Sequence, residues 1–369
     1  MNAERLHAIL KVIRSEIAST NSVGILGQLV AALQNQVSQP QQPNHQQEVA
    51  KHLENLRERL RKVPSNSFSP GWRLIVQEIG GIDNLGDTLI SRLDEVFARN
   101  QITTSVALEE IRAIHESHER FFDAASEGLS SLQHFEIGSE ELEAGEAEVG
   151  VLIPRAAVDN SLAGLGKELD ELDGLLRVFS EIVSQQRPTL QIRTISSSEF
   201  QIFLESVTPI AACVAFAIER VVALYEKLLN IRRLRQELQD EDVPDDMLAG
   251  VQDHANGLMT KGIEGLVEEV LSQFHTGNDE GRVNELKIEL RMTLKRIANR
   301  IDRGYNIEVR AEPTAEEPNE DEANKDPEAE KRRAQEQIIR DASVTLRYRK
   351  LHGEPILSLP EQEPDDGEE

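Results

Sequence analysis

Two histidines three residues apart are the clearest candidates for metal chemistry in this chain. His115 and His118 fall on one face of an expected helix, close to Glu110 and Glu119. Two imidazoles and a carboxylate in that arrangement are ligands suited to zinc. A complete site needs ligands from other elements, and the remaining histidines are scattered along the chain. Two solvated histidines beside a hydrophobic stripe are the simpler alternative, and we expect no cofactor.

Other catalytic sequence motifs are incomplete or absent. A phosphate-binding loop needs a glycine where Ser161 stands and a Ser or Thr where Glu168 stands, so the glycines and lysine between them do not complete that motif. The single cysteine, Cys213, lies in the apolar run 210–216, where a thiol is a poor nucleophile. One cysteine also excludes a disulfide within the chain. No Gly-x-Ser-x-Gly elbow occurs, so we nominate no catalytic residue.

Three groups of basic side chains are candidate binding residues. Two groups end expected helices, where the helix macrodipole alone favours cations. The functional alternative is docking of an acidic partner or of this chain's own tail. The third group steps along one face of a helix expected over 282–303, without the interleaved aromatic residues that stack on single-stranded nucleic acid. The candidates are Arg57, Arg59 and Arg61, then Arg232, Arg233 and Arg235, and finally Arg291 and Lys295.

The net charge of −26 limits the classes of partner. It repels phosphate backbones and anionic lipids over most of the surface, so general nucleic-acid binding is disfavoured. Nine carboxylates lie in 311–330 and six in 361–369. Because 311–330 has no aromatic or branched aliphatic residue, we predict that it is disordered, and that 361–369 is an acidic tail.

The sequence predicts a cytoplasmic protein without membrane association. The first residues include Glu4 and lead into a periodic helix, whereas a secretory signal needs an unbroken apolar segment. The most lipid-like run, 209–218, is followed by Glu219 and Arg220, far short of the ~20 apolar residues that span a bilayer. This run is better explained as a buried helix.

Residues 1–137 are expected to form a helical bundle. Apolar side chains recur every three or four residues over 6–17 and 25–37, and at near-heptad spacing over 49–60. Stripes of this kind are buried against one another or against a second copy, as in a coiled coil. An acidic, glycine-containing linker over 138–148 follows.

An α+β module is expected over 149–310. One helix lying across a three-stranded sheet accounts for its order of elements. A short helix and a β-hairpin are expected over 331–360. The expected strands of the module are 149–154, 189–195, 199–204 and 305–309, and its expected helices are 159–183, 209–238, 245–274 and 282–303. The two strands expected for the hairpin are 344–348 and 356–359.

The predicted fold class is therefore predominantly α with a small α+β module. Helical stripes and a charged segment favour a non-catalytic interaction or scaffold protein, which self-associates or joins a protein complex through 1–63 or 160–240. One alternative is an enzyme or effector whose site is formed by dispersed histidines and carboxylates. Another is an acidic regulator or nucleic-acid mimic that binds a basic partner, for which salt-sensitive binding would be diagnostic.

Overall fold

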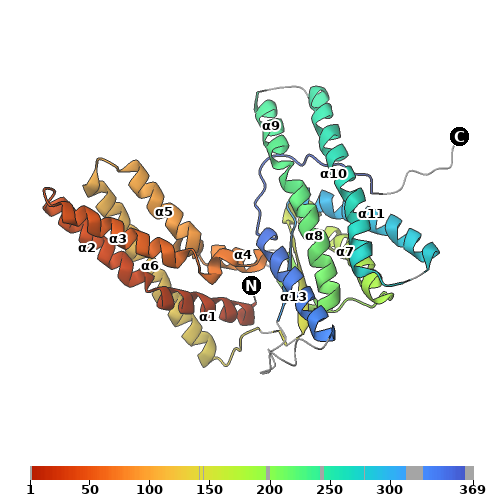
Figure 1. The fold of residues 1–369 in the computed structure, drawn as a ribbon, viewed down its shortest axis with the longest axis horizontal. Coiled ribbons are helices and arrows are strands. Elements are labelled where there is room, and N and C mark those ends of the chain that lie inside the picture. Colours follow the sequence, from red (N-terminus) through yellow and green to blue (C-terminus); the bar gives the residue numbers. More distant parts are fainter. Residues whose placement is uncertain are drawn as a thin grey trace. The chain divides into compact units, whose positions relative to one another are not determined.

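The chain divides into two compact units (Figure 1). The first comprises Met1–Phe68 and Trp72–Glu141, and the second comprises Ser69–Gly71 and Leu142–Glu369. The predicted fold class is confirmed, because the protein is predominantly α-helical with one small antiparallel sheet. This computed structural model describes residues 2–140, 142–143, 145–196, 200–241, 245–277, 279–312 and 327–361.

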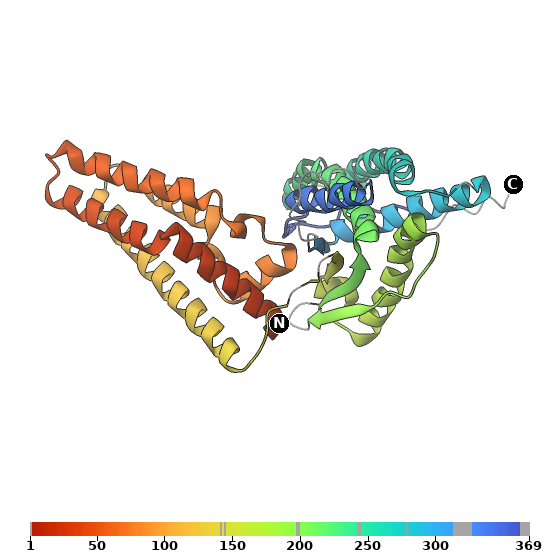
Figure 2. The ribbon, with the colours of Figure 1, turned by 60° about the horizontal axis from the view of Figure 1, so that its bottom comes forward.

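The first unit is built from helices whose ribbons run alongside one another (Figure 2, red to yellow). Its helices are α1 (Ala3–Thr20), α2 (Ser22–Ser38), α3 (Pro43–Leu60), α4 (Pro70–Glu78), α5 (Gly86–Arg99) and α6 (Thr104–His134). One cluster of buried apolar side chains joins α2, α3, α5 and α6, and a second joins α1, α4 and α6. The clusters contain the apolar stripes of the sequence, with Leu26, Leu29 and Leu56 fully buried.

Asparagines mark both ends of α1. The Asn2 side chain accepts hydrogen bonds from the backbone N–H groups of Glu4 and Arg5, at 2.8 and 3.3 Å, and so satisfies two donors that the helix itself leaves free. Asn21 separates α1 from α2 with a φ of 51°, a left-handed conformation that asparagine tolerates better than most residues. The helix end predicted near residues 19–22 is therefore present.

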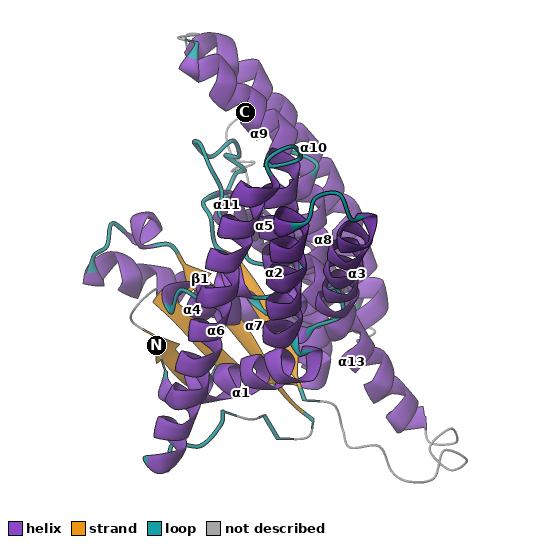
Figure 3. Ribbon diagram, turned by 90° about the vertical axis from the view of Figure 1, so that its left-hand side faces the viewer, coloured by secondary structure: helices purple, strands orange, loops and turns teal. Residues whose placement is uncertain are grey.

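The second unit contains a sheet of four antiparallel strands in the order β2-β3-β1-β4 (orange in Figure 3). Its strands are β1 (Glu146–Ile153), β2 (Ile192–Ser196), β3 (Phe200–Val207) and β4 (Asn306–Ala311), and each overlaps a predicted strand. At the centre of the sheet, Val149 of β1 lies opposite Leu204 of β3 and Val309 of β4. A hairpin turn between β2 and β3 is expected from the three serines 196–198, of which Ser196 ends β2 and the other two lie outside the described residues.

A buried helix, α8, organises the second unit. The helices of this unit are α7 (Leu162–Ser184), α8 (Thr208–Glu226), α9 (Leu229–Asp240), α10 (Asp245–Phe274), α11 (Glu280–Asp302) and α13 (Pro327–Thr345). α8 contacts α7, α10, α11 and α13, and it also contacts β1, β3 and β4. The predicted order of strand, helix, two strands and helix is therefore confirmed, with α8 packed on the sheet.

The apolar composition of α8 follows from this central position. Among the described helices it is the one long and apolar enough to cross a membrane, yet 61% of that apolar window is buried inside the protein. Such burial fits the core helix of a soluble protein. The single helix predicted over 209–238 is wrong in its extent, because Lys227 and Leu228 form a tight turn between α8 and α9.

The C-terminal hairpin predicted at 344–348 and 356–359 is also wrong. α13 continues to Thr345, and the chain from 346 to 361 contains no strand. The disorder predicted over 311–330 is wrong at both ends of this segment, because Ala311 belongs to β4 and Pro327 begins α13. Residues 313–326 and 362–369 lie outside the described part of the chain.

Candidate functional site

β2 is the outer strand of the sheet on one side. It pairs with β3, and no other strand in the described ranges pairs with it. Two of its apolar side chains remain largely in solvent, with Ile192 54% and Ile195 58% exposed. An edge strand with solvent-exposed backbone groups and apolar side chains is a ready template for pairing with another chain.

A register shift in β2 places both isoleucines on the same side of the sheet. Ile192 lies opposite Leu204 and Ile195 opposite Ile202, although the two isoleucines are an odd number of residues apart. The shift occurs between Ile192 and Thr194, so one extra residue is accommodated there. Directly opposed side chains point to the same face of a sheet. Because Ile202 and Leu204 pack into the core of the second unit, both isoleucines extend that core-facing side beyond its helical cover.

A cavity of about 350 Å³ adjoins this edge. It is lined by the chain leading into β2 (188–193), by the first half of β1, by the end of β3, and by side chains of α7 and α8. Its walls are largely apolar, and its apolar lining residues include Ala147, Val149, Leu176, Leu190, Leu204, Ile210 and Val214. A mostly apolar cavity of this volume falls within the usual range of ligand pockets.

Arg193 and Glu146 provide the charge in this cavity together with Glu205. Arg193 Nη2 donates to Glu146 Oε2 at 2.5 Å, so the guanidinium is already paired. The Nε atom of Arg193 is buried and makes no hydrogen bond to the described residues. The site therefore offers apolar contact area, one remaining buried donor and the outer strand of a sheet, which are properties suited to binding an extended segment.

The histidine pair of α6 has a different setting from the one the metal hypothesis requires. His118 is fully buried, and its Nε2 lies 2.7 Å from the hydroxyl of Ser22 on α2. Burial lowers the pKa of His118 to about 4, so the ring is neutral at pH 7. His115 is half-buried and also faces α2, near Gly27. Within the described ranges, no group of three or more His, Cys, Asp or Glu side chains is placed to hold a metal ion.

The basic group at the end of α3 is engaged within the first unit. Arg57 donates to carboxylates of Asp94 and Glu54. Arg59 donates to the backbone carbonyl of Thr20 at 3.0 Å, and Arg61 lies 3.7 Å from Glu54. These arginines therefore bridge the ends of α3 to α1 and α5, in addition to being favoured by the helix macrodipole.

The three arginines of the second basic group have different surroundings. Arg232 is buried against Asp302, while Arg233 lies 3.8 Å from Glu237 on the helix surface. Arg235 donates to the carbonyl of Pro355 at 2.9 Å. Arg232 and Arg235 thus contact the C-terminal part of the same chain, which is the self-docking alternative for a basic cluster.

The third group lies on α11 among acidic neighbours. Arg291 forms an ion pair of 2.8 Å with Glu264 of α10, and Lys295 is half-buried one turn further along. Arg300, on the same helix, is buried and donates to Glu168 and Glu171 of α7. Internal ion pairs therefore account for Arg291 and Arg300.

Comparison with known proteins adds no functional assignment. No protein-family model matches the sequence, and searches of curated proteins and of solved structures found no significant match. Sequence reasoning did not single out the β2 edge, although Ile192 and Ile195 in a short run without acidic residues were a signal for an apolar edge strand.

Proposed function

We propose that this protein is a non-catalytic interaction or scaffold protein, and that the β2 edge is its main docking site. The observation that carries the proposal is the combination of an outer strand, two exposed isoleucines and an adjoining apolar cavity in one place. The site lies within 160–240, one of the regions from which the sequence predicts assembly. A cytoplasmic location is part of the same proposal.

The proposed mode of binding is addition of a strand. An extended segment of a partner protein pairs with the backbone of Ile192–Ser196 and continues the antiparallel sheet. Backbone hydrogen bonds supply affinity that does not depend on sequence, and a side chain that enters the cavity supplies specificity. The chemistry of the cavity favours a segment with alternating apolar residues. A separate protein is favoured over a second copy, because two copies would each bring a net charge of −26.

The proposal is tested by purifying the tagged protein from its native host at low and high salt, with the double variant Ile192→Thr, Ile195→Thr beside it. Threonine retains the tendency to form a strand and removes much of the exposed apolar area. A matched control is Ile102→Thr, because Ile102 is 96% exposed in the first unit. We expect a stoichiometric partner that survives high salt with the wild type and the control, and that is lost with the double variant.

Light scattering on the purified species separates the possible outcomes. A mass equal to two chains that reverts to one chain in the double variant would replace the separate partner with a second copy at the same edge. Retention of the same partner by the double variant would refute the β2 edge as the docking site. A near-stoichiometric metal without any partner would refute the interaction hypothesis and return attention to His115 and His118.

A further inference from the structure

The last described residues of the chain are held by side chains of three helices and form no β pairing. We refer to residues 352–361 as the C-terminal strap, and to Arg232, Asn256, Arg296, Asn299 and Asp302 as the strap site. These five side chains come from α9, α10 and α11, and each makes hydrogen bonds to the backbone of the strap. The strap site therefore recognises a backbone conformation, as sites for extended peptides do.

Asp302 is the centre of the strap site. It is fully buried, and its Oδ2 accepts hydrogen bonds from the backbone N–H groups of Ile356 and Leu357, at 2.7 and 2.6 Å. Its Oδ1 accepts from Arg232 Nη1 at 2.7 Å and from the Tyr225 hydroxyl at 2.6 Å. Arg232 completes the arrangement by donating to the carbonyls of residues 352 and 353. The ion pair of Arg232 with Asp302 thus binds both backbone N–H groups and backbone carbonyls of the strap.

Asn299 provides a second point of recognition. Its side-chain amide donates to the carbonyl of Leu359 and accepts from the N–H of Leu359, both at 3.0 Å. Asn256 accepts from the N–H of Ser358 at 3.0 Å, and Arg296 donates to the carbonyl of Glu361. A primary amide that satisfies both backbone groups of one residue imitates a neighbouring strand. This recognition is independent of the side chain at position 359.

The strap contributes a fixed pattern of side chains. Ile356, Leu357 and Leu359 are buried, whereas Ser358 and Pro360 are exposed. The four residues immediately before Ile356 are all exposed, and Gly353 among them has a φ of 76°. A Cβ atom at Gly353 would lie 2.5 Å from the side-chain oxygen of Gln236, so the turn that leads into the strap requires glycine.

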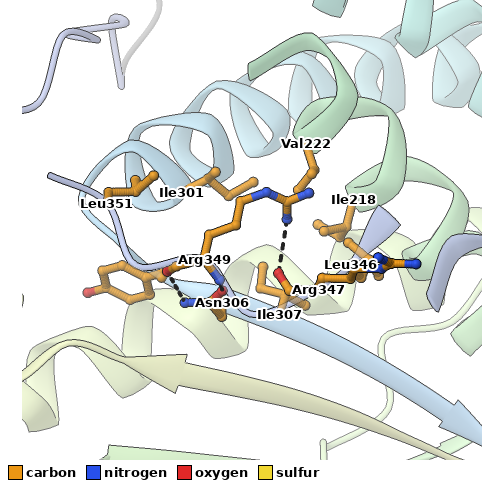
Figure 4. A pocket seen from close by; sticks show the side chains of 10 residues that line it. Ile218, Val222, Ile301, Asn306, Ile307, Leu346, Arg347, Arg349 and Leu351 are labelled. Atoms are coloured by element: carbon orange, nitrogen blue, oxygen red, sulfur yellow. Dashed lines mark hydrogen bonds between the residues drawn. The ribbon is translucent and has the colours of Figure 1, made fainter. Parts of the chain in front are cut away.

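The chain just before the strap is anchored separately (Figure 4). Asn306, at the start of β4, accepts from the N–H of Arg349 at 2.8 Å and donates to its carbonyl at 3.2 Å. A cavity of about 10 Å³ remains beside this contact, lined by side chains that include Ile301 and Leu346. Because this anchor lies upstream of the exposed turn, the strap can leave its site while residues up to 351 stay in place.

We propose that the strap site is a binding site for extended peptides, and that the C-terminal strap is a ligand already bound within the same chain. The ligand class is a segment of a partner protein with two adjacent branched apolar residues, a small polar residue, a third apolar residue and proline. Residues 356–360, Ile-Leu-Ser-Leu-Pro, are the instance in this chain. α10 and α11, which carry four of the five side chains of the site, also pack on α8, so we expect these four to stay in place when the strap leaves. This site is separate from the β2 edge.

A free peptide must compete with the tethered C-terminal strap for the strap site, and the outcome depends on the effective concentration of the strap. A tethered ligand with a short linker experiences an effective concentration on the order of mM, so a free peptide binds the intact protein weakly. Cutting the tether removes this advantage and leaves the contacts unchanged. The proposal is therefore tested by inserting a specific protease site between Glu354 and Pro355, both of which are exposed, and cleaving the folded protein.

The measurement has two parts. Gel filtration shows whether the released fragment separates from the body, whose helix content is followed by far-ultraviolet circular dichroism. A fluorescent peptide of residues 353–361 is then titrated into the separated body, into uncut protein, and into cleaved Asn299→Ala. We expect reversible binding to the body, at least tenfold weaker binding to uncut protein, and at least tenfold weaker binding to the variant, which loses three hydrogen bonds to the peptide.

Two controls make the result specific. Asn284→Ala removes an exposed asparagine from the same helix, and it should leave peptide affinity unchanged. A scrambled peptide of the same composition should bind at least tenfold more weakly. The proposal is overturned if the fragment stays with the body under native conditions, if the body unfolds as the fragment leaves, or if the scrambled peptide binds equally well. The Ile192→Thr, Ile195→Thr variant should bind the peptide normally, which keeps this result distinct from the β2 edge.

Discussion

Two ion pairs, one in each unit of this protein, use charge in opposite ways. In the first unit, ion pairs such as Arg57 with Asp94 and Arg99 with Glu110 lie at the surface, and apolar stripes fill the interior. In the second unit, the ion pair of Arg232 with Asp302 is buried beside α8 and fixes the C-terminal strap. Removing one member of a buried ion pair strongly destabilises a protein, because the other charge is left buried without a partner. A surface ion pair contributes little to stability.

Two natural probes allow this comparison to be measured unit by unit. Trp72 is the single tryptophan, and it packs edge-on against Phe68 in the first unit, so its fluorescence reports that unit. Cys213 is the single cysteine and is fully buried in α8, so its reaction with a thiol reagent reports opening of the second unit. Burial also raises the pKa of the Cys213 thiol, which further suppresses its reaction in the folded state.

The largest effect is expected for Asp302→Ala. Removing one partner of a buried pair leaves the other charge uncompensated, at a cost of about 3–5 kcal/mol. Here the loss also leaves the Tyr225 hydroxyl and two backbone N–H groups without their acceptor. We expect Cys213 to react at a much lower urea concentration, while the Trp72 transition stays where it is.

Asp173→Ala is the matched control for this variant. Asp173 pairs with Arg177 on the surface of α7 in the same unit, at 2.9 Å. A change of at most about 1 kcal/mol is expected for it. Equal effects of Asp173→Ala and Asp302→Ala would show that burial does not distinguish the two ion pairs.

The next effect is a pH dependence that His118 gives to the first unit. The pKa of His118 is about 4 when folded, below its ordinary value of 6.5, because the ring is buried. The unfolded chain therefore binds a proton that the folded chain does not, in the window between these values. The free energy of unfolding is therefore at its full value above pH 6.5 and falls as the pH drops toward 4. At pH 5 the loss due to His118 is about 2 kcal/mol.

Urea unfolding followed by Trp72 fluorescence at pH 7.5 and pH 5 measures this loss. His118→Gln should remove most of the difference between the two pH values, whereas His115→Gln, three residues away and half-buried, should retain it. An unchanged pH dependence in His118→Gln would assign the proton uptake to another group. The same experiment also tests the assignment of His118 to packing rather than metal binding.

The regular elements could be predicted from local pattern, because the apolar periodicity that identifies a helix or strand is itself local. The stripe through Ile9 and Ile13 and the apolar run from Val149 to Ile153 both lead to the observed element. The sequence-based predictions were wrong where a residue distant in the sequence determines the conformation. Residues 356–359 have the composition of a strand, yet they are held by Asp302 and Asn299 of α11 instead of a neighbouring strand.

The candidate sites were less predictable for the same reason. Arg232 has the sequence context of a residue that caps a helix end, but its role depends on Asp302, 70 positions away. His118 has the context of a solvated or metal-binding side chain, but it is paired with Ser22, 96 positions away. The β2 edge depends on a register shift of one residue, for which the sequence around Arg193 gives no specific signal.

The smallest expected effect belongs to the surface pair of the first unit. Arg57→Ala breaks the contacts to Asp94 and Glu54, both of which are well exposed, so the free energy of unfolding should fall by at most about 1 kcal/mol. A double-mutant cycle with Asp94→Ala, followed by Trp72 fluorescence, isolates the pair itself and should give about 0.2–1 kcal/mol. The coupling should also shrink in high salt, since exposed charges are screened. A coupling of several kcal/mol would place Arg57 in the same class as Arg232 and remove the distinction between the two ion pairs.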